Sequence, residues 1–216
     1  MTYRYYFAGA LFCHKELIGN HLLAEAIRDR SGGEFAANLP QKEENQLRPN
    51  PLEIRDNDFR LLLESQLALF NFDGTELDSG TVVEFMAARF LQIPCVLFRT
   101  DFRSAGDQNA DGEAWNLMCS GYPRSLTLRI NALALYHETV VSPDDLAVYV
   151  HRIAKLVVGA LDEVAARPSL YAGDLEKAER VYSLFVKSCG GGFENVMAPE
   201  RIQAILKEKA ESGLLS

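Results

Sequence analysis

The 216-residue sequence is poor in basic residues, in long apolar runs and in the motifs that mark several common enzyme classes. Its 22 lysines and arginines are outnumbered by 30 aspartates and glutamates, which leaves a formal net charge of -8. Binding to nucleic acid or to an anionic membrane surface needs concentrated positive charge, so neither is expected as a partner. No apolar run approaches the roughly 18 residues of a membrane span.

The four cysteines and four histidines are too scattered to indicate a metal or disulfide site. Cys13, Cys95, Cys119 and Cys189 include no C-x-x-C pair. The histidines lack H-E-x-x-H spacing, and the sequence has no Walker A, G-x-G-x-x-G or G-x-S-x-G motif. The scattered cysteines, together with the absence of a signal pattern at residues 1–7, favour a cytoplasmic location.

Short apolar runs alternate with helical patterns over the first two-thirds of the chain. The runs of strand length are residues 3–8, 34–38, 67–72, 94–99 and 125–130. The helical patterns between them include residues 15–28, 54–65 and 81–92. Such alternation predicts right-handed β-α-β units and a parallel sheet with helices on both faces. We expect an α/β, flavodoxin-like doubly wound sheet of about five strands, with ligands outside the carboxyl ends of the strands.

From Ser142 onward the pattern is entirely helical. Serine, proline and two aspartates form a typical helix start there, and a long helix should follow. Two more helices are expected at residues 174–187 and 199–211. We therefore divide the chain into a core, residues 1–141, and a helical C-terminal extension, residues 142–216. The extension should pack on the core or on a neighbouring subunit.

One glutamate stands near the start of a helix that otherwise looks buried. Nearly every residue from Val82 to Leu91 is apolar, yet Glu84 lies among them, six residues after Asp78. Thr81 and Glu84 fit the S/T-x-x-E capping box, which is a purely structural interpretation. Alternatively, Glu84 lies at the ligand-binding edge of the sheet, where the helix dipole favours an ionised carboxylate that can attack carbon. Asp78 would then supply the second carboxylate that glycosidic bond cleavage uses.

The motif Asp78-x-Gly80-Thr81-x-x-Glu84, directly after a buried strand, resembles a motif of the nucleoside 2-deoxyribosyltransferase family. Three more segments resemble motifs of that family in the same order: Tyr6–Phe12, the first strand and substrate loop; Asn57-Asp58, the second helix; and Asn116–Met118, a later pocket segment. Together they extend over about residues 3–135, and four motifs in the right order are more specific than any one of them.

The resemblance implies a role for each matching residue. Glu84 is the nucleophile, and Tyr6 hydrogen-bonds to it and positions it. Asp58 and Asp78 hold the base or the deoxyribose, and one of them handles the proton that the leaving base takes up. The implied substrate-binding residues are Phe7, Gly9, Phe12, Gly80, Asn116 and Met118. The last two would lie near the sugar, in the same or a neighbouring subunit's site. From the residues alone, core packing explains Tyr6 equally well, and a methionine such as Met118 most often fills a core.

The implied reaction transfers a 2-deoxyribosyl group between the purine or pyrimidine bases of 2′-deoxynucleosides, as in nucleoside salvage. A covalent deoxyribosyl–Glu84 intermediate and two inversions give net retention. The resemblance implies no metal and no organic cofactor. The expected partners are a deoxynucleoside, a free nucleobase and further copies of the chain in a homo-oligomer, a dimer or larger. Two alternatives stay open: a 2′-deoxynucleoside 5′-monophosphate N-glycosidase, and a nucleotide-binding sensor without turnover.

Asp78 bears on the choice between transferase and monophosphate hydrolase. In the hydrolases that resemble this family, a serine that helps to hold the phosphate stands six residues before the catalytic glutamate. The negative charge of Asp78 would instead repel a phosphate dianion in a partly desolvated pocket. We therefore expect a substrate with a free 5′-hydroxyl.

Overall fold

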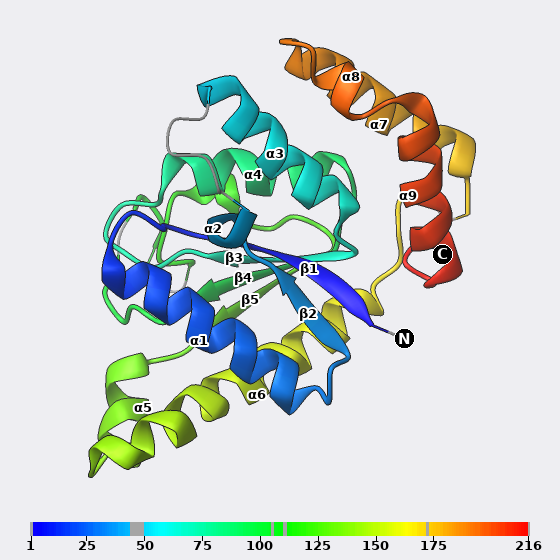
Figure 1. The fold of residues 1–216 in the computed structure, drawn as a ribbon. Coiled ribbons are helices and arrows are strands. Elements are labelled where there is room, and N and C mark those ends of the chain that lie inside the picture. The colour runs from blue at the N-terminus through cyan, green and yellow to red at the C-terminus, as the bar shows by residue number, and fades with distance from the viewer. Residues whose placement is uncertain (1, 44–49, 105, 110–111, 172, 216) are drawn as a thin grey trace.

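The computed structural model describes residues 2–43, 50–104, 106–109, 112–171 and 173–215. Five strands form one parallel sheet in the order β2-β1-β3-β4-β5 (Figure 1). The strands are β1 (Tyr3–Ala8), β2 (Phe35–Asn38), β3 (Leu67–Asn71), β4 (Cys95–Arg99) and β5 (Ser125–Arg129). This order confirms the predicted flavodoxin-like doubly wound sheet.

Helices cover both faces of the sheet (Figure 1). The main helices are α1 (His14–Arg30), α3 (Pro51–Glu64), α4 (Ser79–Phe90) and α6 (Leu146–Ala165). Helices α1 and α6 pack on one face, and α3 and α4 pack on the other. The shorter elements are α2 (Pro40–Glu43), α5 (Ala132–Thr139), and the 3-10 turns Leu117–Cys119 and Pro143–Asp145.

Strand β1 shows how the sheet separates two hydrophobic cores. Because successive side chains of a strand point to opposite faces, Tyr5 and Phe7 enter the core under α1 and α6. Tyr6 and Ala8 enter the core under α3 and α4. All four side chains are at most 2% exposed, so the register of this strand is fixed by burial on both faces. Tyr6, on the face of the sheet that α4 covers, carries a hydroxyl group at the end of its buried ring.

The helices after residue 141 divide between the two faces of the sheet. Helix α6 packs on α1 and on strands β4 and β5, so it completes the layer that covers the sheet. Helices α7 (Leu175–Cys189), α8 (Phe193–Val196) and α9 (Pro199–Glu211) lie beyond it and join the core on the α3 side. The predicted boundary at residues 141 and 142 stays a prediction.

Several sequence expectations were wrong in detail. Helix α4 begins two residues earlier than the predicted residue 81. Helix α5 was not predicted, because none of its residues is buried and it carries no apolar stripe that periodicity could detect. In the described part of the chain, no helix is long and apolar enough to cross a membrane.

Candidate functional site

Helix α4 begins with Asp78 as its N-cap. The Oδ2 atom of Asp78 accepts hydrogen bonds from the backbone nitrogen of Thr81 (2.7 Å) and from its Oγ1 (2.8 Å). The capping box predicted for Thr81 and Glu84 is therefore wrong, because Thr81 is already inside the helix. Glu84 lies in the second turn, beyond the reach of most of the helix dipole. The Glu84 carboxylate does not cap the helix, so its position depends on other contacts.

Glu84 is held by a tyrosine from the first strand. The Tyr6 hydroxyl donates a hydrogen bond to Oε1 of Glu84 at 2.7 Å, although the two residues are 78 positions apart. The Tyr6 ring is fully buried, so the hydroxyl has a fixed position in the sheet. This hydrogen bond restrains the orientation of the carboxylate through Oε1 and does not involve Oε2. The hydrogen bond that the resemblance implied between Tyr6 and Glu84 is present, and the positioning role of Tyr6 stays a prediction.

A cavity of about 420 Å³ lies between the N-terminal parts of α3 and α4, against Glu84. Helix α3 contributes Asp58 and Phe59, and helix α4 contributes Gly80 and Glu84. The remaining lining residues are Pro51, Ile54, Arg55, Ser79 and Val83. The cavity therefore brings Asp58 and Glu84, two of the predicted catalytic carboxylates, to one place at the carboxyl edge of the sheet. A nucleoside-sized ligand fits a volume of this order.

The carboxyl group of Glu84 has an unusual protonation equilibrium. Burial is the largest cause and raises its pKa to about 8. The hydrogen bond from Tyr6 opposes this shift, and the negative charges of Asp58 and Asp78 add to it. At neutral pH the protonated form of Glu84 is therefore favoured, and the group must lose a proton before it can act as a carboxylate.

Arg55 is a cavity residue that the sequence interpretation missed. Its Nε and Nη2 atoms donate to Oδ1 of the neighbouring Asp56 at 2.9 and 2.6 Å. Nothing in the local sequence separates it from an ordinary surface arginine on a helix. Only the tertiary structure places this guanidinium beside the acidic cavity, where the neighbouring carboxylate largely balances its charge.

The sequence model of one family matches residues 5–118, more than half of the chain; its description is nucleoside 2-deoxyribosyltransferase. The chain belongs to the nucleoside 2-deoxyribosyltransferase family. The matched segment contains every candidate site residue, from Tyr6 to Met118. No curated protein sequence matches the chain.

Three solved structures are similar to this deoxyribosyltransferase-family chain. A conserved protein from Enterococcus faecalis V583 is 21% identical, with 76% of this chain and 99% of that one covered and a TM-score of 0.48. A 2-desoxiribosyltransferase from Leishmania mexicana is 18% identical, with 63% and 97% covered and a TM-score of 0.48. A 2-deoxyribosyltransferase from Bacillus psychrosaccharolyticus is 20% identical, with 46% and 74% covered and a TM-score of 0.39.

Three of the family-implied residues on the first strand and loop are not among the residues that line the Glu84 cavity. The Phe7 side chain is buried in the core under α1 and α6, on the opposite face of the sheet. Phe12 is 77% exposed in the loop before α1. At Gly9, a Cβ atom would lie 2.9 Å from Cβ of Asn71, so the close approach of β1 to β3 explains the glycine. Asp58, Gly80 and Glu84 line one cavity and Tyr6 bonds to Glu84, whereas these three do not line that cavity.

Asn116 and Met118 line a different cavity, of about 470 Å³, between the loop Gly74–Leu77 and the turn Leu117–Cys119. Ser79 lines both this cavity and the Glu84 cavity, so the two meet at the first turn of α4. Asn116 caps its own turn, accepting from the backbone nitrogen of Met118 at 2.9 Å. Met118 is 66% exposed, so it does not fill the core of its own chain.

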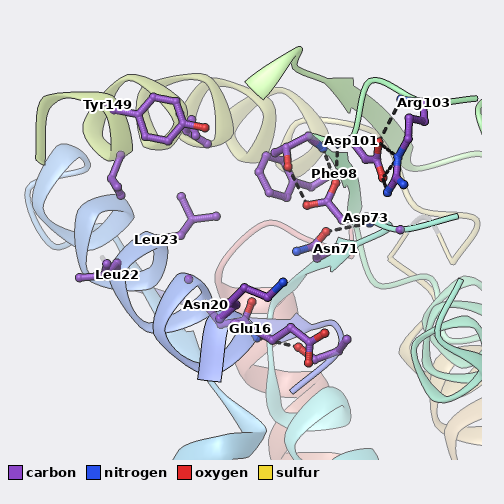
Figure 2. Close-up of a pocket in the computed structure, with 17 residues that line it drawn as sticks. Glu16, Asn20, Leu22, Leu23, Asn71, Asp73, Phe98, Asp101, Arg103 and Tyr149 are labelled. Carbon is purple, nitrogen blue, oxygen red and sulfur yellow. Dashed lines mark hydrogen bonds and ion pairs between the residues drawn. The ribbon is translucent and has the colours of Figure 1, made fainter. Parts of the chain in front are cut away.

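A larger cavity than that of Glu84, about 560 Å³, lies between α1 and α6 (Figure 2). Asp73 and Asp101 face it from the loops after β3 and β4, but both carboxylates are already bonded. Asp73 accepts from the backbone nitrogens of Thr100 (2.5 Å) and Asp101 (2.8 Å). Arg103 forms an ion pair with Asp101 at 2.5 Å and holds the pKa of that carboxyl below its usual range. Asp73 therefore connects the loop after β3 to the loop after β4, and Asp101 bonds within its own loop.

Metal-binding arrangements are absent from the described residues. No group of three or more histidine, cysteine, aspartate or glutamate side chains there could hold a metal ion. All four cysteines are free thiols.

Proposed function

We propose that this chain transfers the 2-deoxyribosyl group between the bases of 2′-deoxynucleosides, with Glu84 as the nucleophile. The observation that carries the proposal is the 2.7 Å hydrogen bond from Tyr6 to Glu84 beside a cavity that Asp58 also lines. Family membership supports the same reaction class. The two oxygens of Glu84 then have separate tasks, one accepting from Tyr6 and the other facing the substrate.

In the first step, Oε2 of ionised Glu84 attacks C1′ of the deoxynucleoside from the face opposite the base. The glycosidic C–N bond breaks, and its electron pair moves to the base nitrogen. A proton from a carboxylic acid, Asp58 or Asp78, neutralises the leaving base. The product is a covalent deoxyribosyl ester of Glu84.

In the second step, a nitrogen of another base attacks C1′ and displaces the Glu84 carboxylate. The acceptor base loses its proton to the carboxylate that served as the acid. Two inversions at C1′ give net retention, as in retaining glycosidases. Because the sugar has no 2′-hydroxyl to withdraw electrons, its oxocarbenium-like transition state forms without metal assistance.

We assign Asp58 a more direct part in proton transfer than Asp78, because Asp58 lines the cavity and its negative charge contributes to the raised pKa of Glu84. Asp78 uses Oδ2 in the cap of α4, which leaves Oδ1 for a substrate hydroxyl. We propose that Asp78 holds the deoxyribose while the proton passes through Asp58.

Asn116 and Met118 are proposed to contact the sugar in a homo-oligomer. Their cavity adjoins the Glu84 cavity at Ser79, and the exposed side chain of Met118 is accessible to a neighbouring copy. A dimer or larger assembly would then be needed for full activity.

The monophosphate N-glycosidase is the second candidate, and Arg55 is the observation that favours it. A guanidinium in the cavity wall could bind a phosphate. However, two of its donors already bond to Asp56, and Asp78 stands at the start of α4, where the hydrolases have a serine. The deoxynucleoside is therefore the preferred substrate of the proposal.

The deciding experiment incubates the protein with a deoxynucleoside and a millimolar second base, and separates the products by chromatography. An exchanged nucleoside is the expected product, and a slow fluorinated deoxynucleoside should label Glu84, as located by peptide mass spectrometry. Base release with no exchanged nucleoside would indicate a hydrolase. Ligand binding with no released base would indicate a sensor.

A further inference from the structure

The C-terminal helices α7–α9 contact α3 along its whole length. In the second turn of α3, Nη2 of Arg55 donates to the carbonyl of Gly190 at 3.4 Å. A Cβ atom on Gly191 would lie 3.2 Å from the same Nη2, so the Gly190–Gly192 turn lies directly against α3. At the last turn, Nε of Arg201 donates to Oε1 of Glu64 at 2.7 Å. Both ends of the helix are therefore held by the extension.

The middle of α3 is held by aromatic packing. The ring of Phe59 meets Phe185 edge to face, with 5.2 Å between centroids, and Phe193 at 6.3 Å. Phe59 also lines the Glu84 cavity, next to Asp58 in sequence. One ring therefore has the proposed substrate cavity on one side and the C-terminal helices on the other. Because the rings of Phe185 and Phe193 pack directly against Phe59, a displacement of either ring is passed to Phe59 and so to the wall of the cavity.

We propose that α7–α9 form a brace that sets the position of α3, and through it the position of Asp58 relative to Glu84. Phe185 and Arg201 are positioning residues of this brace, and neither touches the substrate. The inference rests on the proposed roles of Glu84 and Asp58. The extension thus has a task in the active site although it lies outside the segment that matches the family model, residues 5–118.

A matched pair of substitutions on α7 tests the brace. Phe185→Ala removes the ring that packs on Phe59, whereas Leu184→Ala removes an apolar side chain that is 60% exposed. A shift of about 1 Å at a catalytic group can cost about 10²-fold in rate. Phe185→Ala should therefore lower kcat by about tenfold to 10²-fold, with a smaller change in KM. Leu184→Ala should stay within about twofold of wild type, and Phe185→Leu should recover part of the loss.

A second readout does not depend on turnover. The titration of Glu84 is followed by the ¹³C resonance of its labelled carboxyl, assigned with Glu84→Gln. The groups that face it are Tyr6 from β1, Asp58 from α3 and Asp78 at the start of α4. If the brace sets the distance to Asp58, Phe185→Ala should move the titration midpoint of Glu84 to lower pH. Leu184→Ala should leave that midpoint unchanged.

A surface pair repeats the test without opening a hole in the core. Arg201→Ala removes the contact to Glu64, and Arg180→Ala removes a cation that pairs with Glu176 of its own helix, α7, at 3.4 Å. Arg201→Ala should shift the Glu84 midpoint in the same direction by a smaller amount, and its control should not. If both brace variants keep their thermal unfolding transition and match their controls in midpoint and kcat, the brace is wrong. A wild type without base exchange overturns the proposed function instead, and the titration still decides the brace.

Discussion

The two faces of the sheet each carry a cavity at the carboxyl edge, and the cavities differ in how their carboxylates are bonded. Between α1 and α6 lies the larger one, where Asp73 bonds backbone nitrogens and Asp101 pairs with Arg103 (Figure 2). Between α3 and α4, Asp58 lies near Glu84, whose pKa burial raises to about 8. The smaller cavity holds the carboxyl group with the raised pKa, and we expect reactivity to follow that group rather than cavity volume.

The same comparison separates structural acids from chemical ones. A carboxylate that accepts hydrogen bonds from backbone nitrogens, or that pairs with an arginine, is stabilised in its charged form, and its pKa falls. One that is buried near other carboxylates becomes more basic and therefore available for proton exchange. Asp78 stands between these classes, because one oxygen caps a helix while its charge still raises the pKa of Glu84.

The largest expected effect comes from Glu84→Gln. Without the nucleophile the covalent route is closed, so deoxyribosyl transfer should fall by about 10³-fold or more. The Tyr6 hydroxyl can still donate to the amide oxygen, so the fold should be retained. The measurement is the initial rate of base exchange. A near wild-type rate in this variant would show that Glu84 is not the nucleophile.

The stability of the same variant has a definite sign. The folded-state pKa of Glu84 is raised from 4.5 to about 8, so the unfolded state releases this proton at lower pH than the folded state does, and this difference costs stability as pH rises through that interval. Glutamine avoids this cost, and Glu84→Gln should melt at the same temperature as wild type or higher at pH 8. A structural capping role predicts a different outcome on removal of the side chain, a loss of about 0.5–2 kcal/mol.

Asp58→Asn should have the next largest effect. A neutral amide cannot supply the proton, so transfer should fall by about 10²–10⁴-fold. Removal of its charge also lowers the pKa of Glu84, and the rise of kcat/KM with pH should move to lower pH. The pH profile of the residual rate is the measurement. An unchanged profile would place Asp58 outside the electrostatic reach of Glu84.

Tyr6→Phe should shift the profile in the opposite direction. The Tyr6 hydrogen bond opposes the raised pKa of Glu84, so its loss raises that pKa further. The acid limb of kcat/KM should then move to higher pH, and kcat should drop by about tenfold as the carboxylate loses its fixed plane. Opposite shifts in these two variants would be hard to obtain from any site but this cavity.

Particular residues show which features of the fold and of the candidate site could be predicted from the sequence. Apolar patterns suffice for the strands and for α9, because burial on a regular element imposes its period locally. The start of α4 could not be chosen from pattern, since Asp78, Ser79 and Thr81 are all good caps and backbone geometry selects among them. The Tyr6–Glu84 contact came from family resemblance, because no periodic pattern links residues 78 positions apart.

Asp78→Ser should change substrate preference more than overall rate. The serine keeps a capping oxygen for the Thr81 amide, so the start of α4 should survive. Wild type should turn over deoxynucleosides far better than their 5′-monophosphates. The variant should lose deoxynucleoside activity and narrow that difference, because the repulsive charge is gone. The ratio of kcat/KM values for the two substrates measures the effect, and a wild-type preference for the monophosphate would sink the transferase proposal.

The smallest effect is expected on the opposite face of the sheet. Tyr149 lines the large α1/α6 cavity, and its hydroxyl donates to the carbonyl of Ala132 at 3.3 Å. Tyr149→Phe removes that hydrogen bond and little else, so the free energy of unfolding should fall by only about 0.5–1.5 kcal/mol. Base exchange should stay within about twofold of wild type, because the cavity between α3 and α4 is untouched. If exchange instead fell tenfold with the melting transition preserved, the larger cavity would take part in the reaction, and cavities on both faces of the sheet would belong to one active site.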